Sequence, residues 1–348
     1  MSRLTLIPLL LLANAAAFAA EDSAPAPASA PETGPRAALM ARHLAQARMI
    51  DITTAGSALV AVGEAGVILR STDGKTWQQS PSPTDVMLTR VLFTDANHGW
   101  VLGYDASIMQ TVDGGKTWTL QHHDPKGRAL YDLLFLNAQK GIAVGAYGQM
   151  LETLDGGKTW LAQDSALTHL GVHLNVLLKL SDGSLFVAGE RGLMARSKDA
   201  GVSWQTLNSP YAGSFFGAQL QGEKGLLLYG MRGNLFSTTD LNKAATLDIA
   251  KWDPDKRQTV TDAGQIAALG WRRIENESHE SLFGALPLKD GELLLVGVNG
   301  TVLKLNAAGT TLTPIKTPAA ETLVKLVAFK GRMIAVGRRM IQDIGAMP

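Results

Sequence analysis

The stretch TLDGGKTW at residues 153–160 decides the fold, because the chain repeats it. TVDGGKTW stands at residues 111–118, a shortened copy, STDGKTW, at residues 71–77, and a looser copy, SKDAGVSW, at residues 197–204. The shared pattern is Ser/Thr-x-Asp-x-Gly-x-Thr/Ser-Trp. It predicts a tight turn between two strands, repeated along the chain.

Each residue type in this pattern has a structural task. The Asp carboxylate accepts hydrogen bonds from backbone N–H groups just after it, and Gly adopts the positive φ that the turn needs. The Trp that opens the next strand is large enough to fill the gap between neighbouring sheets. We therefore interpret these acids as structural, and not as catalytic or calcium-binding groups. They are Asp73, Asp113, Asp155 and Asp199, with Trp77, Trp118, Trp160 and Trp204.

A second repeat gives the number of units. A glycine ends one apolar run in every unit, and successive glycines are 40 to 44 residues apart, except for a gap of 67 residues in the fifth interval. Four short β-prone runs in each unit of this length predict the blades of a β-propeller. The sequence thus predicts an all-β, seven-bladed propeller of four-stranded blades. The glycines are Gly63, Gly103, Gly145, Gly189, Gly230, Gly297 and Gly337.

Two irregularities accompany the repeat. The long interval predicts an insertion, residues 241–269, in the fifth blade; its Trp252 either anchors a partner or packs the insertion onto its blade. The last unit has no fourth β-prone run before Pro348. Propellers remove an exposed edge by borrowing a strand from the other terminus. Residues 37–44 are the nearest unassigned segment, so we expect them to close the last blade.

The two ends of the chain differ in composition. Residues 1–19 combine Arg3, an apolar run and a small-residue cleavage motif, which predicts a signal peptide and a periplasmic or secreted product. Residues 20–36 are rich in Pro and Ala and are expected to form a flexible linker before the propeller at residues 37–348. No later segment predicts membrane insertion of the mature protein, and we expect a monomer in isolation.

Composition excludes several classes of function. The net charge of +1 gives no electrostatic case for nucleic-acid binding. The absence of cysteine excludes disulfides, thiolate metal sites and a lipid carried on cysteine. The 46% hydrophobic content is sufficient for a sizeable core. We expect no cofactor and no resident metal.

The motifs resemble the Asp-box, or BNR, repeats of sialidase-type propellers. The layout V-G-x-x-G followed by T-x-D-G-G-x-T-W, at residues 144–160, is more similar to secreted propellers related to the photosystem II assembly and stability factor. That resemblance implies a non-catalytic, exported protein that binds an envelope protein or membrane-protein complex as an assembly or accessory factor, in some cases beside a transporter. The alternative is a secreted sialidase-type glycoside hydrolase. Such an enzyme needs an arginine triad, a Tyr–Glu pair and an acid/base Asp, and no spacing in the chain picks these out.

The turns between the second and third strands of the blades give the candidate partner-binding surface. Their second variable position carries arginine on blades four, five and seven, whereas Glu64 and Asp105 stand on blades one and two. Opposed charges on one rim are able to orient a partner, although hairpin tips in water are commonly charged. The predicted partner-binding residues are Arg191, Arg232, Arg338, Arg339, Tyr147 and Asn299.

Histidines in the loops that lead into the first strands raise an alternative for the same rim. A His-x₃-His spacing with a neighbouring His-His-Asp would bind zinc or copper if the loops of blades two to four met. Separate loops carry histidine often, so we expect no metal site. These residues are His122, His123, His169, His173 and His279.

Overall fold

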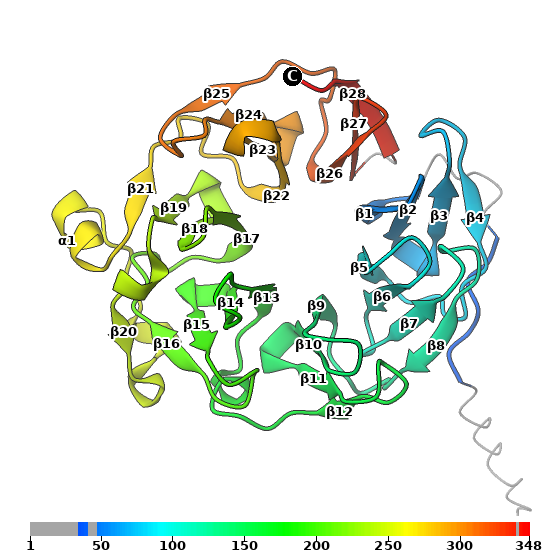
Figure 1. Cartoon of the computed structure of the whole chain (residues 1–348), viewed down its shortest axis with the longest axis horizontal. Coiled ribbons are helices and arrows are strands. Elements are labelled where there is room, and N and C mark those ends of the chain that lie inside the picture. The colour runs from blue at the N-terminus through cyan, green and yellow to red at the C-terminus, as the bar shows by residue number, and fades with distance from the viewer. Residues whose placement is uncertain (1–33, 41–46, 339–340) are drawn as a thin grey trace, which may run out of the picture. The chain divides into compact units, whose positions relative to one another are not determined.

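The computed structural model describes residues 34–40, 47–338 and 341–348. Seven antiparallel sheets stand around a common axis, and the first strand of each sheet is innermost (Figure 1). The prediction of a seven-bladed β-propeller is confirmed. The expected signal peptide lies outside the described residues, as does the expected linker up to residue 33.

The first four blades each contain four consecutive strands in sequence order. The strands are β1 (Met49–Ala55), β2 (Ala58–Gly63), β3 (Ile68–Ser71) and β4 (Gln78–Ser80); β5 (Leu88–Phe93), β6 (Gly99–Gly103), β7 (Ile108–Thr111) and β8 (Thr119–His122); β9 (Leu130–Phe135), β10 (Gly141–Gly145), β11 (Met150–Thr153) and β12 (Leu161–Ala162); β13 (Leu174–Lys179), β14 (Leu185–Gly189), β15 (Met194–Ser197) and β16 (Gln205–Leu207).

The last three blades depart from this regularity. In blade five the outer strand β21 pairs with β19 after a long excursion of the chain, and blade seven has three strands among the described residues. The strands are β17 (Phe215–Gln221), β18 (Gly225–Gly230), β19 (Leu235–Thr238) and β21 (Arg272–Ile274); β22 (Leu282–Pro287), β23 (Leu293–Gly297), β24 (Val302–Leu305) and β25 (Leu312–Pro314); β26 (Leu323–Phe329), β27 (Arg332–Gly337) and β28 (Ile341–Ala346).

The hydrophobic core consists of the interfaces between blades. One cluster joins Val62 of blade one to Val101 of blade two, and the same arrangement recurs at each of the seven interfaces. Trp118 lies in this first cluster, and its indole N–H donates to Gly115 O at 3.2 Å. Trp160 and Trp204 occupy the next two interfaces. The Trp of the repeat therefore fills the gap between neighbouring blades, as the sequence predicts.

The Asp of each repeat organises its turn. Asp155 Oδ1 accepts the N–H groups of Lys158 and Thr159 at 3.0 and 2.9 Å, and the hydroxyls of Thr153 and Thr159 donate to the same carboxylate. The Thr159 hydroxyl and then its N–H group lower the pKa of Asp155 to about 2. The other three carboxylates accept the same kinds of donors, from the residues that follow them in the turn and from the Ser or Thr before them. Each of these acids therefore accepts several hydrogen bonds within its own turn.

The insertion in blade five crosses to blade four. Its strand β20 (Thr246–Leu247) pairs with β16 and becomes a fifth strand at the outer edge of blade four (Figure 1). One short helical turn precedes β20 and two follow it, and one six-residue helix, α1, precedes β21. Within residues 34–40, 47–338 and 341–348, no helix has the length and apolar character needed to cross a bilayer. The helical segments are η7 (Leu241–Lys243), η8 (Ile249–Lys251), η9 (Pro254–Lys256) and α1 (Ala263–Ala268).

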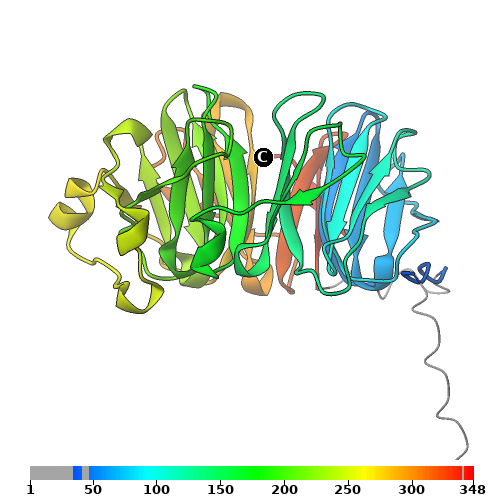
Figure 2. The ribbon, with the colours of Figure 1, turned by 90° about the horizontal axis from the view of Figure 1, so that it is seen from below.

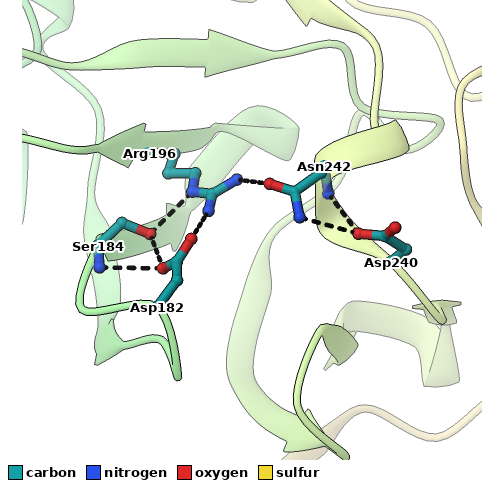
Figure 3. A network of polar contacts seen from close by, with 5 residues as sticks. All are labelled: Asp182, Ser184, Arg196, Asp240 and Asn242. Atoms are coloured by element: carbon teal, nitrogen blue, oxygen red, sulfur yellow. Dashed lines mark hydrogen bonds and ion pairs between the residues drawn. The ribbon is translucent and has the colours of Figure 1, made fainter.

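Figure 3 shows the polar network that holds the start of the insertion. Arg196 is 8% exposed, and its guanidinium donates to Ser184 Oγ at 2.8 Å and to Asp182 on blade four. It also donates to Asn242 Oδ1 at 2.9 Å, and the backbone and side-chain N–H groups of Asn242 both donate to Asp240. All three nitrogens of the guanidinium are therefore bonded, and blades four and five are joined through one side chain.

Trp252 packs into the core and does not project towards a partner. It is 5% exposed and lies in the cluster that contains Trp204 and Leu167, at the interface of blades three and four. The sequence left two roles for Trp252, partner anchor or packing of the insertion, and the structure shows packing. The surface that it covers belongs to blade four, however, and not to blade five, where the insertion begins.

The closing strand predicted from residues 37–44 is wrong for the described part of that segment. Residues 37–40 form no strand, and the Ala38 N–H donates to Ser82 O at 3.1 Å, just after blade one. Residues 41–46 lie outside the described residues. The sheet of blade seven contains β26, β27 and β28 within residues 34–40, 47–338 and 341–348. Apolar packing of Phe329 and Val336 against Leu59 and Leu69 joins it to blade one instead.

Candidate functional site

One face of the ring, here called the rim, carries the turns between the second and third strands of the blades (Figure 2). In six of these turns the second variable residue is a non-glycine residue with φ between +53° and +55°. The backbone is therefore the same in all six, and only the presented side chain changes. The residues are Ala65, Asp105, Tyr147, Arg191, Arg232 and Asn299.

The glycines that flank this residue are required by close backbone contacts. A Cβ atom on Gly63 would lie 2.0 Å from Arg48 O, where the chain leads into the innermost strand of the same blade. A Cβ atom on Gly66, whose φ is +70°, would lie 1.9 Å from Thr84 O in the loop that leads into blade two. Each turn is thus fixed between its own blade and the next.

The structure places the predicted partner-binding residues unequally. Arg191 and Arg232 are exposed and form no ion pair within the described residues. Arg338 is also exposed, but Nε lies 4.0 Å from a carboxylate oxygen of Glu321. The Asn299 side-chain amide donates to Glu280 Oε1 at 3.0 Å. Arg339 lies outside the described residues.

Tyr147 contacts His173 and Arg128, which lie outside the repeated motif. Its ring is 59% exposed, lies edge-on to His173 at 4.5 Å between centroids, and has the Arg128 guanidinium 5.3 Å from its centroid. The Tyr147 N–H donates to His173 Nδ1 at 3.1 Å, and the His173 N–H donates to Glu190 Oε2 at 3.2 Å. These contacts connect the Tyr147 turn on blade three to the Arg191 turn on blade four. An exposed aromatic ring held by its neighbours, on the same face of the ring as Arg191 and Arg232, is well suited to contact a protein surface.

The two acidic residues of the rim differ in their ion pairing. Glu64 forms an ion pair with Arg48 at 3.3 Å, so its charge is largely compensated, whereas Asp105 forms none among the described residues. The histidines of the rim have separate partners. His123 Nδ1 lies 3.1 Å from Ser107 Oγ, and His169 Nε2 lies 2.6 Å from Asp164. No group of three His, Cys, Asp or Glu side chains in the described parts of the chain could hold a metal ion.

The centre of the ring contains a charged feature that sequence reasoning missed. Arg90 on blade two lies between Asp51 on blade one and Asp132 on blade three, at 3.4 and 3.1 Å. Asp51 also accepts the Val91 N–H at 2.9 Å, and Asp132 accepts the Leu177 N–H at the same distance. The Asp132 charge, opposed by burial and assisted by Asp51, raises the pKa of Arg90. These contacts tie the innermost strands of blades one to four together.

A β-bulge places these residues in the centre of the ring. The first residue of an inner strand pairs with the glycine at the end of the second strand, and the register then shifts by one residue. On blades one, two, three and seven the residue after the bulge lines the central cavity with a charged side chain. Asp51, Arg90 and Asp132 all occupy this position, which carries different residue types in the other blades. Because the residue type changes from blade to blade, the repeat itself gives no signal for this site.

Fold and site define the class: an Asp-box β-propeller whose turns present a basic and aromatic rim beside a charged central channel. The chain belongs to the family described as photosynthesis system II assembly factor YCF48, whose family model matches residues 69–276. It is similar to photosystem II assembly protein Ycf48 of Thermosynechococcus vestitus, with 31% identity over 205 residues, or 58% of this chain and 56% of that protein.

A further relative and a solved structure extend the comparison. Photosystem II assembly lipoprotein Ycf48 of Synechocystis sp. is 44% identical over 43 residues, which is 12% of this chain and 13% of the relative. The chain thus spans little more than half the length of the first of these relatives. The structure titled "YCF48 bound to D1 peptide" has a TM-score of 0.64 at 17% identity and covers 87% of this chain and 95% of its own. That likeness shows a shared fold.

Proposed function

We propose that this chain is an exported, non-catalytic assembly factor that binds an acidic segment of a membrane-protein complex through its rim. The rim is the observation that carries the proposal: identical turns present Arg191 and Arg232 without ion-pair partners beside Tyr147, whose ring is held in place. The family relatives are named as assembly proteins, and one related propeller was solved with a peptide.

The chemistry of the rim defines the partner. Guanidinium groups bind carboxylates through two parallel hydrogen bonds, and an exposed tyrosine adds apolar contact area at a small cost in conformational entropy. An extended segment with two or more carboxylates and an apolar or aromatic residue would contact Arg191, Arg232 and Tyr147 together. We place this partner in a complex of the bacterial envelope, which includes the possibility of a transporter, because residues 1–19 have the pattern of a signal peptide.

The experiment compares two double substitutions of Arg191 and Arg232, which occupy equivalent positions in their turns. Arg191→Glu/Arg232→Glu reverses two charges, whereas Arg191→Asn/Arg232→Asn removes them and keeps a residue type that tolerates positive φ, as Asn299 shows. The purified protein is titrated calorimetrically against the partner captured from membranes of the host. Each Glu substitution should weaken association at least about tenfold, and the Asn substitutions by less.

The control is Lys116→Glu, which lies in an Asp-box turn on the opposite face and should leave association unchanged. Association of the wild-type protein should weaken as salt is raised, because exposed charges are screened over about 8 Å at physiological ionic strength. Equal association of the wild type and the Glu double variant would exclude the rim as the binding surface. The insertion at residues 241–269 would then be the next surface to test.

A further inference from the structure

The central channel contains a cavity whose wall carries donor atoms that form no well-aligned hydrogen bond among the described residues. The cavity has a volume of about 480 Å³, and all seven inner strands contribute to its wall. On four consecutive blades the residue after the β-bulge is charged, and the sign alternates around the ring. In the order of blades seven, one, two and three, these residues are Lys325, Asp51, Arg90 and Asp132.

Three of the polar side chains in this wall have unused donors. The carboxylates of Asp51 and Asp132 accept backbone N–H groups and face Arg90, but neither lies within ion-pair distance of Lys325. Lys325 is partly buried and has no hydrogen-bond or ion-pair partner among the described residues. Arg90 Nε donates no well-formed hydrogen bond, although it lies 3.1 Å from Asp132.

Tyr229 supplies the third donor. Its side chain comes from the second strand of blade five and is 5% exposed, and a Cβ atom on Gly217 would lie 2.2 Å from its hydroxyl oxygen. Glycine at position 217 is therefore what allows the phenol to reach the cavity wall. The hydroxyl has no hydrogen-bond partner among the described residues. Burial raises the pKa of Tyr229, so the group remains a neutral donor.

The part of the cavity nearer the rim is apolar on the side formed by blades five, six, seven and one, and it carries Thr89, Tyr131 and Asn175 on the other side. The bulge residue just before each of these positions lies one step closer to the rim turns, and on blades five to seven and one it is apolar. The rings of Phe216 and Phe283 contact each other at 5.2 Å between centroids. A molecule that enters from the rim on this side therefore meets an apolar half-ring, here called the collar, before it reaches the ammonium, guanidinium and phenol groups. The collar residues are Ile50, Phe216, Phe283 and Val324.

We propose that the channel is a binding site for a carboxylate carried on an apolar stem, with Lys325, Arg90 and Tyr229 as donors to the carboxylate. Cation and phenol donors around one point recognise an anion, and the aromatic collar requires an apolar group next to it. A free carboxylic acid and the C-terminal residue of an extended peptide share this chemistry. The site lies apart from Arg191 and Arg232, so it does not depend on the partner proposed for the rim.

Calorimetric titration tests the proposal with matched probes. Hexanoate represents the free acid, and an acetylated tripeptide that ends in leucine represents a chain terminus; each is compared with its amide. We expect at least one carboxylate to bind and both amides to fail. If only the tripeptide binds, the ligand is a chain terminus; if hexanoate binds as well as the tripeptide does, the ligand is a small acid. Inorganic phosphate, which lacks the stem, should bind at least about tenfold more weakly than the better carboxylate.

Variants locate the site. Lys325→Met keeps the aliphatic stem and should weaken binding about tenfold, whereas Tyr229→Phe removes one oxygen and should weaken it about fivefold. Lys316→Met, an exposed lysine on blade six, should change nothing. Circular dichroism melting identifies any variant that fails to fold. If Lys325→Met fails to fold, the conservative Tyr229→Phe substitution alone tests the site. No binding of either carboxylate to the wild type, equal binding of phosphate, or full binding by Tyr229→Phe would each overturn the proposal.

Discussion

A single residue in the left-handed conformation determines what each blade presents on the rim. This conformation costs most side chains about 1 kcal/mol or more relative to glycine, yet the six turns that have it carry Ala, Asp, Tyr, Arg, Arg and Asn. Since Ala65 adopts it too, the conformation belongs to the turn and is not by itself a sign of function. The difference between blades lies in the side chain, so the rim can change its specificity without any change of backbone.

The Asp-box carboxylates provide a prediction about stability and pH. The pKa of Asp113 is about 2 in the folded protein, where burial would raise it but hydrogen bonds from the Thr117 hydroxyl and N–H group outweigh burial; the unfolded value is about 4. Because the folded pKa is the lower one, the ionised group stabilises the fold above about pH 4, and this contribution is lost as pH falls towards 2.

Asp113→Ala should therefore reduce the free energy of unfolding by about 1–2 kcal/mol at pH 7, the effect of leaving turn N–H groups without an acceptor. The difference from the wild type should shrink when urea unfolding is repeated at pH 3. Partner binding at temperatures where the variant stays folded should be unchanged. A variant that kept its unfolding free energy but lost binding would make Asp113 a binding residue.

The sequence predicted those residues whose role is repeated in every blade. Asp155, Trp160 and the flanking glycines recur at a fixed spacing, so their local chemistry could be derived from the pattern alone. Contacts made once could not be derived. The packing of Arg128 and His173 around Tyr147 joins loops of different blades, and the channel charges change type from blade to blade. Such residues have no period, and only the closed ring brings them together.

At the scale of elements, the insertion interrupts one blade and packs on its neighbour. The chain leaves blade five after β19 and returns as β21, as the spacing indicates. Between these strands it adds β20 to blade four and buries Trp252 there. An apolar segment packs against whichever exposed apolar surface lies nearest in the folded ring. The sequence of a single blade does not show where that surface lies.

Trp252→Ala tests this packing. Loss of a buried tryptophan should lower the free energy of unfolding by about 3 kcal/mol, because a cavity forms beside Trp204 and Leu167. Hydrogen exchange should also increase at β16, since β20 is held on its edge by the same packing. Lys251→Ala, an exposed neighbour in the same insertion, is the matched control and should change neither quantity. Unchanged exchange at β16 would show that β20 is held by its backbone pairing alone.

At the scale of the whole molecule, the ring is closed by side chains at the junction of blades seven and one. Phe329 and Ile334 of blade seven lie in one cluster with Met49 and Leu59 of blade one. The Lys330 ammonium donates to Thr72 O at 2.9 Å across the same junction. The repeat count predicted seven blades, but the means of closure depends on which surfaces meet after a full turn of the ring. That information is not contained in any single repeat.

The closing junction should be the point at which the ring opens first, because in residues 34–40, 47–338 and 341–348 no loop between strands crosses it, whereas such a loop crosses each of the other junctions. Phe329→Ala and Phe135→Ala are a matched pair, since both residues end inner strands and contribute to interfaces between blades. Each should lower the free energy of unfolding by about 3 kcal/mol. Only Phe329→Ala should increase hydrogen exchange selectively at β26, β27, β28 and β1, since among the described residues side-chain contacts, and no connecting loop, hold these two blades together. Equal exchange in all blades of both variants would mean that the ring unfolds as one unit, with closure no weaker than any other interface.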